Sequence, residues 1–95
     1  MEIVLSELAQ QDLGDILQYT LETWGEKQMD VYAEKLERGI RLLQDSPRVG
    51  KSREDWFSGC HCYQVENHLV LYAIAEGVIR FARLFHARMD VIRNF

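Results

Sequence analysis

The single proline of the chain, Pro47, marks a change in the spacing of apolar residues that strongly constrains the fold. Before this residue, apolar side chains recur every three or four positions, which is the period of an amphipathic helix. After it, they alternate or run continuously over short stretches, which is typical of β-strands. The residue before a proline is also pushed out of the helical conformation. We therefore expect the helices in the first half of the chain and most of the sheet in the second half.

Two helices are predicted before the proline. Ser6 is a suitable N-cap for the first helix, whose apolar stripe runs to Trp24, and Gly25 can end it in a left-handed conformation. The second helix extends to Asp45 and stops before Pro47. Because only two or three residues link these helices, they are expected to lie antiparallel as a hairpin with a shared apolar face.

Four short apolar runs predict strands, one before the helices and three after them. The dipeptide Glu76–Gly77 is a hairpin turn signal. A polar connection, residues 48–59, precedes the later strands, and residues 87–95 can form one or two helical turns. The predicted fold is α+β in the order β-α-α-β-β-β, with a helical hairpin packed on a small, mainly antiparallel sheet. The strands are expected at residues 2–5, 61–65, 69–74 and 78–85.

The length and composition are those of one globular unit. A chain of 95 residues accommodates a single hydrophobic core, so residues 1–95 are expected to form one domain. No apolar run approaches the ~18 residues that a membrane span needs. The N-terminus lacks the basic and apolar regions of a signal peptide. We therefore expect a cytoplasmic protein without membrane attachment, whose cysteines stay reduced.

The net charge of −4 conceals an uneven distribution. Residues 1–47 carry ten acidic and four basic side chains, a charge of −6, whereas residues 48–95 carry seven basic and five acidic ones, a charge of +2. An acidic helix face usually serves only solubility, and the alternative is a surface that meets a basic partner. Coating nucleic acid requires clustered Lys and Arg. We expect no direct, sequence-specific binding of nucleic acid by this chain.

Cys60 and Cys62 lie two residues apart, about 6.6 Å along a strand, which is too far for an unstrained disulfide. His61 and His68 are near in sequence, but His61 points to the opposite face of the strand from the cysteines. No second cysteine pair exists. Ordinary half-buried cysteines are therefore expected, with no metal site and no cofactor.

His86 ends the last predicted strand. Alternation places it on the same face as Arg80, with Arg83 on the other face and Arg88 following in the tail. A histidine among arginines can cleave RNA, because the imidazole takes the 2′-hydroxyl proton while guanidinium groups stabilise the phosphate. The alternative is a structural histidine that bonds to the backbone and fixes the tail.

Motifs along the whole chain, taken in order, resemble those of ParE-type toxins. The last of them is similar to a closing Leu-His-x-x-Met-Asp signature and is the most specific. The motifs are Asp12-Leu13-x-x-Ile16-x-x-Tyr19, Trp24-Gly25-x-x-Gln28-x-x-x-Tyr32, Leu43-x-x-Ser46-Pro47-x-x-Gly50, Leu71-Tyr72 and Leu84-Phe85-His86-Ala87-Arg88-Met89-Asp90.

The resemblance implies the toxin of a bacterial type II toxin–antitoxin pair, with the fold of the ParE/RelE superfamily. ParE-type toxins poison DNA gyrase and do no known chemistry of their own, whereas the RelE branch cuts mRNA on the ribosome. Here Ala87 follows His86 where some nucleases have a tyrosine. Mainly because the closing motif ends in Met89-Asp90, we favour gyrase inhibition without catalysis. The alternatives are a ribosome-dependent nuclease and a non-toxic relative that only binds antitoxin. A nuclease would use His86, Arg80, Arg83 and Arg88.

The resemblance also implies a cognate antitoxin whose arm wraps the toxin, and an arm with several Lys or Arg would suit the acidic half. We expect the arm on the outer surface of the helical hairpin and the gyrase-inhibiting surface on the last strand and tail. The antitoxin-binding residues expected are Tyr19, Trp24, Met29, Tyr32 and Leu36. The target-inhibition residues expected are Trp56, Arg83, His86, Arg88, Met89, Asp90 and Phe95. A structural role for Asp90, as a cap of the tail or a partner of Arg83 or Arg88, is the alternative.

Overall fold

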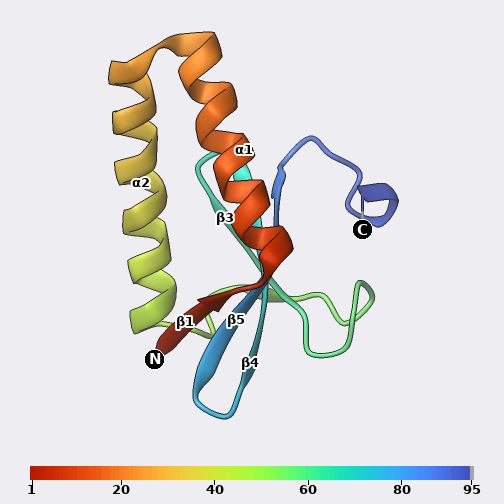
Figure 1. Ribbon diagram of the computed structural model, residues 1–95. Helices are drawn as coiled ribbons and strands as arrows, with labels where there is room; N and C mark the ends of the chain where they lie inside the picture. Colours follow the sequence, from red (N-terminus) through yellow and green to blue (C-terminus); the bar gives the residue numbers. More distant parts are fainter. Residues whose placement is uncertain (95) are drawn as a thin grey trace.

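A mixed five-stranded sheet carries two antiparallel helices on one face (Figure 1). The computed structural model describes residues 1–94. In chain order the elements are β1 (Glu2–Leu5), α1 (Glu7–Trp24), α2 (Glu26–Asp45), β2 (Lys51–Ser52), β3 (His61–Val65), β4 (His68–Ala75), β5 (Val78–His86) and a 3-10 turn (Ile92–Asn94). The strands lie in the order β1-β5-β4-β3-β2, and only the β1–β5 pair is parallel. The predicted α+β class and helical hairpin are confirmed.

Gly25 alone joins α1 to α2, a shorter link than the two or three residues expected. Its N–H donates to the Leu21 carbonyl at 2.9 Å, and its own carbonyl accepts from the Met29 N–H at 3.0 Å. The φ angle of 92° is one that glycine adopts readily and other residues rarely do. The chain therefore reverses at a single residue that caps both helices.

Lys51 and Ser52 form a two-residue strand inside the segment that was expected to be a polar connection. They pair with the beginning of β3. Two residues are too few to show an alternating pattern, so the sequence carries no signal for this strand. The chain leading to it is held by Tyr72, whose hydroxyl donates to the Pro47 carbonyl at 2.8 Å and accepts from the Gly50 N–H at 3.1 Å.

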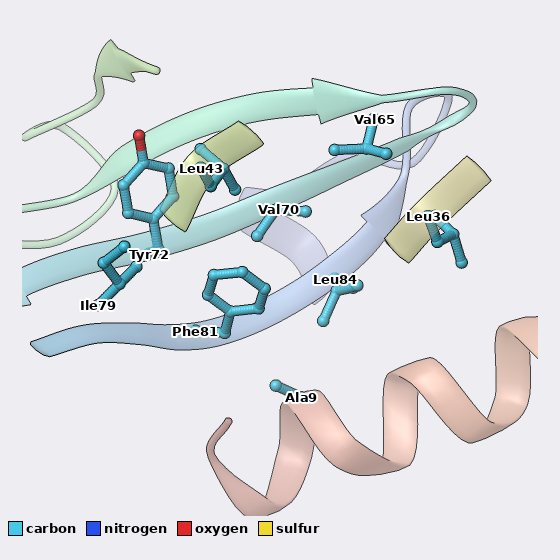
Figure 2. Close-up of a cluster of buried hydrophobic side chains, with 9 residues drawn as sticks. All are labelled: Ala9, Leu36, Leu43, Val65, Val70, Tyr72, Ile79, Phe81 and Leu84. Carbon is cyan, nitrogen blue, oxygen red and sulfur yellow. The ribbon is translucent and has the colours of Figure 1, made fainter. Parts of the chain in front are cut away.

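Buried side chains lie on both faces of the sheet. The larger group fills the space between the helices and the sheet (Figure 2). The smaller group lies on the far face, where Trp56 and Phe57 of the connecting loop pack against it. The larger group contains Ala9, Leu36, Leu43, Val65, Val70, Tyr72, Ile79, Phe81 and Leu84. The smaller group contains Cys60, Leu71, Phe85 and Val91.

Ser6 begins α1 in the way predicted. Its side-chain oxygen accepts from the Ala9 N–H at 3.0 Å and donates to the Ala82 carbonyl at 2.8 Å. Its own N–H donates to the Phe81 carbonyl at 3.0 Å. The pairing of β1 with β5 stops at Phe81, so Ser6 continues the hydrogen bonding of β5 just beyond the end of β1.

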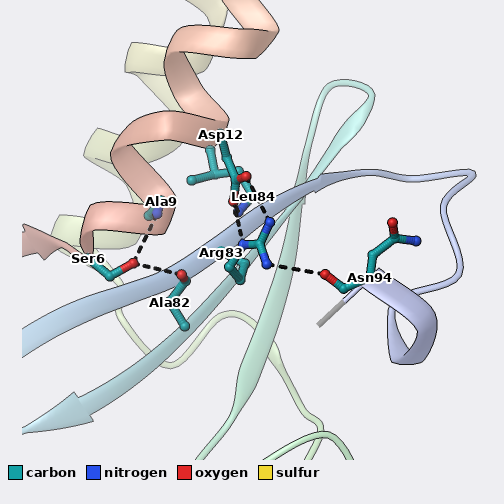
Figure 3. Close-up of polar contacts among 7 residues, drawn as sticks. All are labelled: Ser6, Ala9, Asp12, Ala82, Arg83, Leu84 and Asn94. Atoms are coloured by element: carbon teal, nitrogen blue, oxygen red, sulfur yellow. Dashed lines mark hydrogen bonds and ion pairs between the residues drawn. The ribbon is translucent and has the colours of Figure 1, made fainter.

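Asp12 ties α1 to the next part of β5 (Figure 3). Its carboxylate accepts two hydrogen bonds from the Arg83 guanidinium, at 2.7 and 3.0 Å, and one from the Leu84 N–H at 3.0 Å. Arg83 also donates to the Asn94 carbonyl at 3.2 Å. Because both charged side chains are largely buried, this ion pair is screened less than a surface pair. It joins the helix, the last strand and the tail.

The pairing of β4 with β5 is interrupted by a β-bulge. Leu71 lies opposite Arg83, but the next residue of β4 lies opposite Phe81, so Ala82 is an extra residue on β5. An extra residue reverses the alternation of side chains in the part of the strand that follows it. Residues on either side of the bulge therefore cannot be assigned to faces by one continuous count.

The tail after β5 forms one helical turn, as the prediction of one or two turns allowed. The Asp90 carboxylate accepts from the Arg93 N–H at 3.4 Å, and its carbonyl accepts from the Asn94 side-chain amide at 2.7 Å. The ion-pair partner of Asp90 is Arg93, at 3.6 Å, rather than Arg83 or Arg88. Asp90 therefore caps the turn. Across residues 1–94, no helix combines the length and apolarity needed to cross a bilayer.

Two helical glycines test how closely α2 packs on the sheet. A methyl group on Gly39 would overlap the side chain of Val65, which is stiff and buried, whereas one on Gly14 would meet open space. We expect Gly39→Ala to lower the free energy of unfolding by about 1–2 kcal/mol, because overpacking outweighs the gain in helix propensity. Gly14→Ala should raise it by up to about 1 kcal/mol. Urea unfolding of both variants measures this, and shifts of the same sign would contradict the packing.

A second test concerns Asp12. Asp12→Ala leaves the Arg83 guanidinium and the Leu84 N–H without their partner, so we expect the free energy of unfolding to fall by about 2–3 kcal/mol. The matched control is Glu34→Ala, which breaks the exposed pair with Arg38 and should cost under about 0.5 kcal/mol. Equal losses of unfolding free energy in the two variants, measured by chemical denaturation, would show that Asp12 does not hold α1 to β5.

Candidate functional site

A pocket of about 460 Å³ opens where the half of the helical hairpin nearer its tip meets the start of β4 and the end of β5. Both helices, both strand ends and the first residues of the tail contribute to it. We call it the histidine pocket. Its lining residues are Tyr19, Thr20, Trp24, Gln28, Tyr32, Asn67, His68, His86 and Arg88.

His86 reaches this pocket because of the β-bulge. Ile79 and Phe81 face the helices before the bulge, so Arg80 between them faces away. Beyond the bulge Leu84 faces the helices, and His86, two residues later, does so as well. The prediction that His86 shares a face with Arg80 is therefore wrong, and the extra residue in β5 is the physical reason.

The two histidines lie opposite each other on β4 and β5, with ring centroids 5.3 Å apart. The Tyr32 hydroxyl is 2.6 Å from Nδ1 of His68 and accepts from the Asn67 N–H at 3.2 Å. Nδ1 of His86 accepts from the backbone N–H of Arg88 at 3.1 Å. In each ring, Nδ1 is therefore used within the protein.

The hydrogen bonds determine which nitrogen carries the proton. Burial, and secondly repulsion from His86, lower the pKa of His68 to about 4, so this ring is neutral at pH 7. Burial also raises the pKa of Tyr32, which stays protonated and donates to Nδ1 of His68. The proton of His68 is then on Nε2. Nδ1 of His86 accepts from the Arg88 N–H, so this nitrogen carries no hydrogen and the ring hydrogen is on Nε2.

A second hollow, about 340 Å³, adjoins the histidine pocket between α1 and the tail. It shares Tyr19, His68 and His86 with that pocket and extends to Met89. Together the two hollows form one concave region beside α1. Residues of the helical hairpin and of the tail, which were expected to serve different partners, meet there.

The five residues expected to bind antitoxin are divided by the structure. Tyr19 and Trp24 are 64% and 69% exposed near the tip of the hairpin. Met29 is partly exposed, and Tyr32 turns inward to His68. Leu36 is only 3% exposed and belongs to the core between helices and sheet, so it offers no outer surface to a partner.

The residues expected to inhibit a target are also dispersed. His86 and Arg88 line the histidine pocket, Met89 lines the adjoining hollow, and Asp90 is exposed in the tail. Trp56 lies against the far face of the sheet, and the central carbon of the Arg53 guanidinium stacks 3.8 Å from the centre of the Trp56 ring. Arg83 is held by Asp12. Phe95 lies outside the described residues.

Of the residues expected for RNA cleavage, only His86 and Arg88 come together. Arg80 is exposed and faces away from the helices, and Arg83 is occupied by its ion pair. His68 was not predicted to be a member of the site. In a regular hairpin, counting residues from the turn between β4 and β5 would place His68 opposite Phe85. The extra residue in β5 makes His86 its partner instead. Counting from this turn could therefore have predicted that His68 lies beside the end of the last strand, next to His86.

Cys60 and Cys62 share one face of the sheet and His61 lies on the other, as alternation predicted. The cysteines are on the face away from the helices, and His61 stacks on Tyr72 on the helix side, with ring centroids 5.4 Å apart. Both thiols are free, and burial raises the pKa of Cys60 to about 11, so it stays protonated. Among residues 1–94, no three His, Cys, Asp or Glu side chains are arranged to hold a metal ion.

The shifted histidine predicts a pH dependence of stability. Between its ordinary pKa of 6.5 and about 4, His68 is protonated in the unfolded chain but not in the folded one. Its contribution to the free energy of unfolding is therefore fully present above pH 6.5 and is lost as the pH falls toward 4. His68→Gln, which still accepts from Tyr32 but does not titrate, should remove this loss. Urea unfolding at several pH values gives the difference between the two proteins, and a constant difference would contradict the assignment.

Comparisons with known proteins agree with this architecture. The model of the family described as "ParE toxin of type II toxin-antitoxin system, parDE" matches residues 3–91. Toxin ParE1 of Mycobacterium tuberculosis is 33% identical over 92 residues, which cover 96% of this chain and 94% of that protein. Toxin ParE of Escherichia coli is 32% identical over 91 residues, covering 94% and 87%.

A solved structure shares the fold. A chain of the "Chromosomal ParDE TA system from P. aeruginosa" superposes with a TM-score of 0.79, covering 93% of this chain and 97% of that one, at 16% identity. The family match spans nearly all the elements from β1 to the tail. The chain therefore belongs to the ParE toxin family of type II toxin–antitoxin systems.

Proposed function

We propose that this chain is a toxin that inhibits DNA gyrase, blocks replication in the cytoplasm and is neutralised by a cognate antitoxin. The proposal combines family membership with the function that the sequence resemblance implies. Inhibition requires a surface that binds gyrase and no chemistry by the chain itself. The concave region beside α1, with His86, Arg88 and Met89 at its tail side, is our candidate for that surface.

The ion pair between Arg83 and Asp12 is the observation that favours inhibition over RNA cleavage. A nuclease needs cations free to stabilise the phosphate in the transition state. The Arg83 guanidinium instead donates twice to Asp12 and once to the Asn94 carbonyl. With Arg80 on the other side of the sheet, Arg88 is the one arginine of the expected set in the pocket. This geometry supports a binding surface over a catalytic one.

The antitoxin is proposed to pack on the hairpin near its tip. Tyr19 and Trp24 expose large aromatic surfaces there, and aromatic side chains of this kind are enriched among the residues that dominate binding energy. Tyr32 contributes through the histidine pocket instead of the outer surface, and Leu36 supports the helix from within. A partner seated on Tyr19 and Trp24 would also cover part of the pocket that contains His86.

A plasmid assay tests the function. Purified chain, added to gyrase and supercoiled plasmid, should cause cleaved DNA to accumulate, whereas mRNA on ribosomes should stay intact. Met89→Ala should weaken the effect on gyrase about tenfold, as loss of an important contact does, with a change in unfolding free energy under about 1 kcal/mol because Met89 is 41% exposed.

Leu42→Ala is the matched control, since Leu42 is 43% exposed on α2 and lies outside the concave region. It should leave gyrase inhibition unchanged. Cut mRNA without cleaved plasmid would overturn the proposal in favour of the nuclease, and activity on neither would indicate a relative that only binds antitoxin. Equal effects of the two substitutions would exclude Met89 from the inhibiting surface.

A further inference from the structure

The histidine pocket presents hydrogen-bond donors that the protein does not use. Nδ1 of His68 and of His86 is occupied, and Nε2 of each ring has no hydrogen-bond partner among residues 1–94. In that part of the chain, no buried side-chain nitrogen or oxygen lacks a partner, so both Nε2 atoms are reached by solvent. Because Nδ1 of each ring accepts a hydrogen bond, the ring hydrogen is on Nε2 in both histidines. Two N–H groups are therefore available to a ligand.

Arg88 adds a full positive charge to these donors. Its guanidinium is exposed and forms no ion pair or hydrogen bond with the residues that the structure describes. The lining described for the pocket contains no Asp or Glu, although it lies against the acidic half of the chain. An arginine and two imidazole N–H groups without a competing carboxylate favour a negatively charged acceptor.

The size of the charge favours a carboxylate over a phosphate. One guanidinium, with two imidazoles that each offer a single N–H, balances a single negative charge. Asp15, which has no ion-pair partner among residues 1–94, lines the adjoining hollow, and Glu66 is close enough to influence the pKa of Tyr32. A nucleic-acid backbone with successive phosphates would meet these acids and be repelled. A metal ion is also disfavoured, because a protonated Nε2 cannot ligate one.

The surroundings indicate a side chain of a protein partner. Tyr19 and Trp24 expose apolar ring surface on the α1 side of the pocket. A carboxylate on a polypeptide can enter the pocket while neighbouring apolar residues pack on these rings, so that polar and apolar contacts are made by the same segment.

We infer that the histidine pocket is a carboxylate-binding site that receives an Asp or Glu side chain of the antitoxin. The inference rests on the proposed function, because it assumes that the antitoxin covers the hairpin near Tyr19 and Trp24. It adds a chemical requirement to that partner. An arm rich in Lys and Arg would suit the acidic helix faces, but the segment over the pocket needs an acid, so the arm carries both charges in a defined order.

The full chain, labelled with ¹⁵N-histidine, allows the site to be tested directly. The probes are N-acetylglutamate α-amide, which has one side-chain carboxylate, its neutral glutamine counterpart, and inorganic phosphate. We expect the carboxylate probe to shift the Nε2 signals of His68 and His86 in a saturable manner, and to bind more tightly than phosphate. The glutamine probe should cause little shift. Equal shifts with the neutral probe, or tighter binding of phosphate, would overturn the inference.

Arg88→Gln should weaken the carboxylate probe about tenfold, because it removes the one charged donor. The control is Arg48→Gln, which removes an exposed arginine in the turn after α2, away from the pocket, and should change binding less than twofold. Arg88 is exposed, so the variant is expected to fold, and the imidazole spectrum of the free protein verifies this. An unchanged affinity in folded Arg88→Gln would overturn the inference.

Binding of the cognate antitoxin separates this inference from the proposed function. If Trp24→Ala and Arg88→Gln both weaken the antitoxin about tenfold while Arg48→Gln does not, the carboxylate site and the proposed hairpin surface are both supported. If only Trp24→Ala weakens it, the carboxylate site is wrong and the hairpin surface stands. If neither weakens it, the antitoxin does not bind the proposed hairpin surface, and the inferred carboxylate site is wrong as well.

Discussion

The carboxylate of Asp12 is the contact on which the arrangement of the molecule most depends. It accepts three hydrogen bonds from Arg83 and Leu84, which belong to the part of β5 beyond its pairing with β1. Through Arg83 it also reaches the tail at Asn94. Tyr19 follows Asp12 by about two helical turns, on the same side of α1. The tie therefore sets how Tyr19 lies relative to His86, with which it lines both hollows.

Most of the fold could be predicted because its signals are local. The period of apolar residues, the Ser6 cap and the glycine after Trp24 locate the helices, and alternation assigns Cys60 and Cys62 to one face. What could not be predicted depends on single residues without a local signal. The two-residue strand β2 is too short to have a period, and the extra residue at Ala82 lies in a strand that is almost continuously apolar, so that alternation does not reveal it. The single-residue link at Gly25 depends on how the helices pack.

The candidate site was predicted less completely, because its residues meet through long-range contacts. Asp12 and Arg83 are 71 positions apart, so nothing in the sequence around Arg83 reveals that its charge is already paired. The bulge turns His86 toward the helices and places it opposite His68, which removes Arg80 from the site and adds a second imidazole. Leu36 shares the helical stripe of the expected antitoxin site, yet it lies on the side of the stripe that faces the sheet. Exposure, unlike period, depends on the final packing.

Residues that were expected to serve two partners converge on one concave region. Tyr19 and Trp24 approach it from the hairpin, and His86, Arg88 and Met89 from the last strand and tail. We therefore expect a partner on the hairpin to cover the tail side as well. Hydrogen–deuterium exchange of the chain with and without its cognate antitoxin tests this most directly. Slower exchange in residues 19–32 and 86–90 together is the predicted result, and slower exchange confined to the helices, with the tail unchanged, would contradict it.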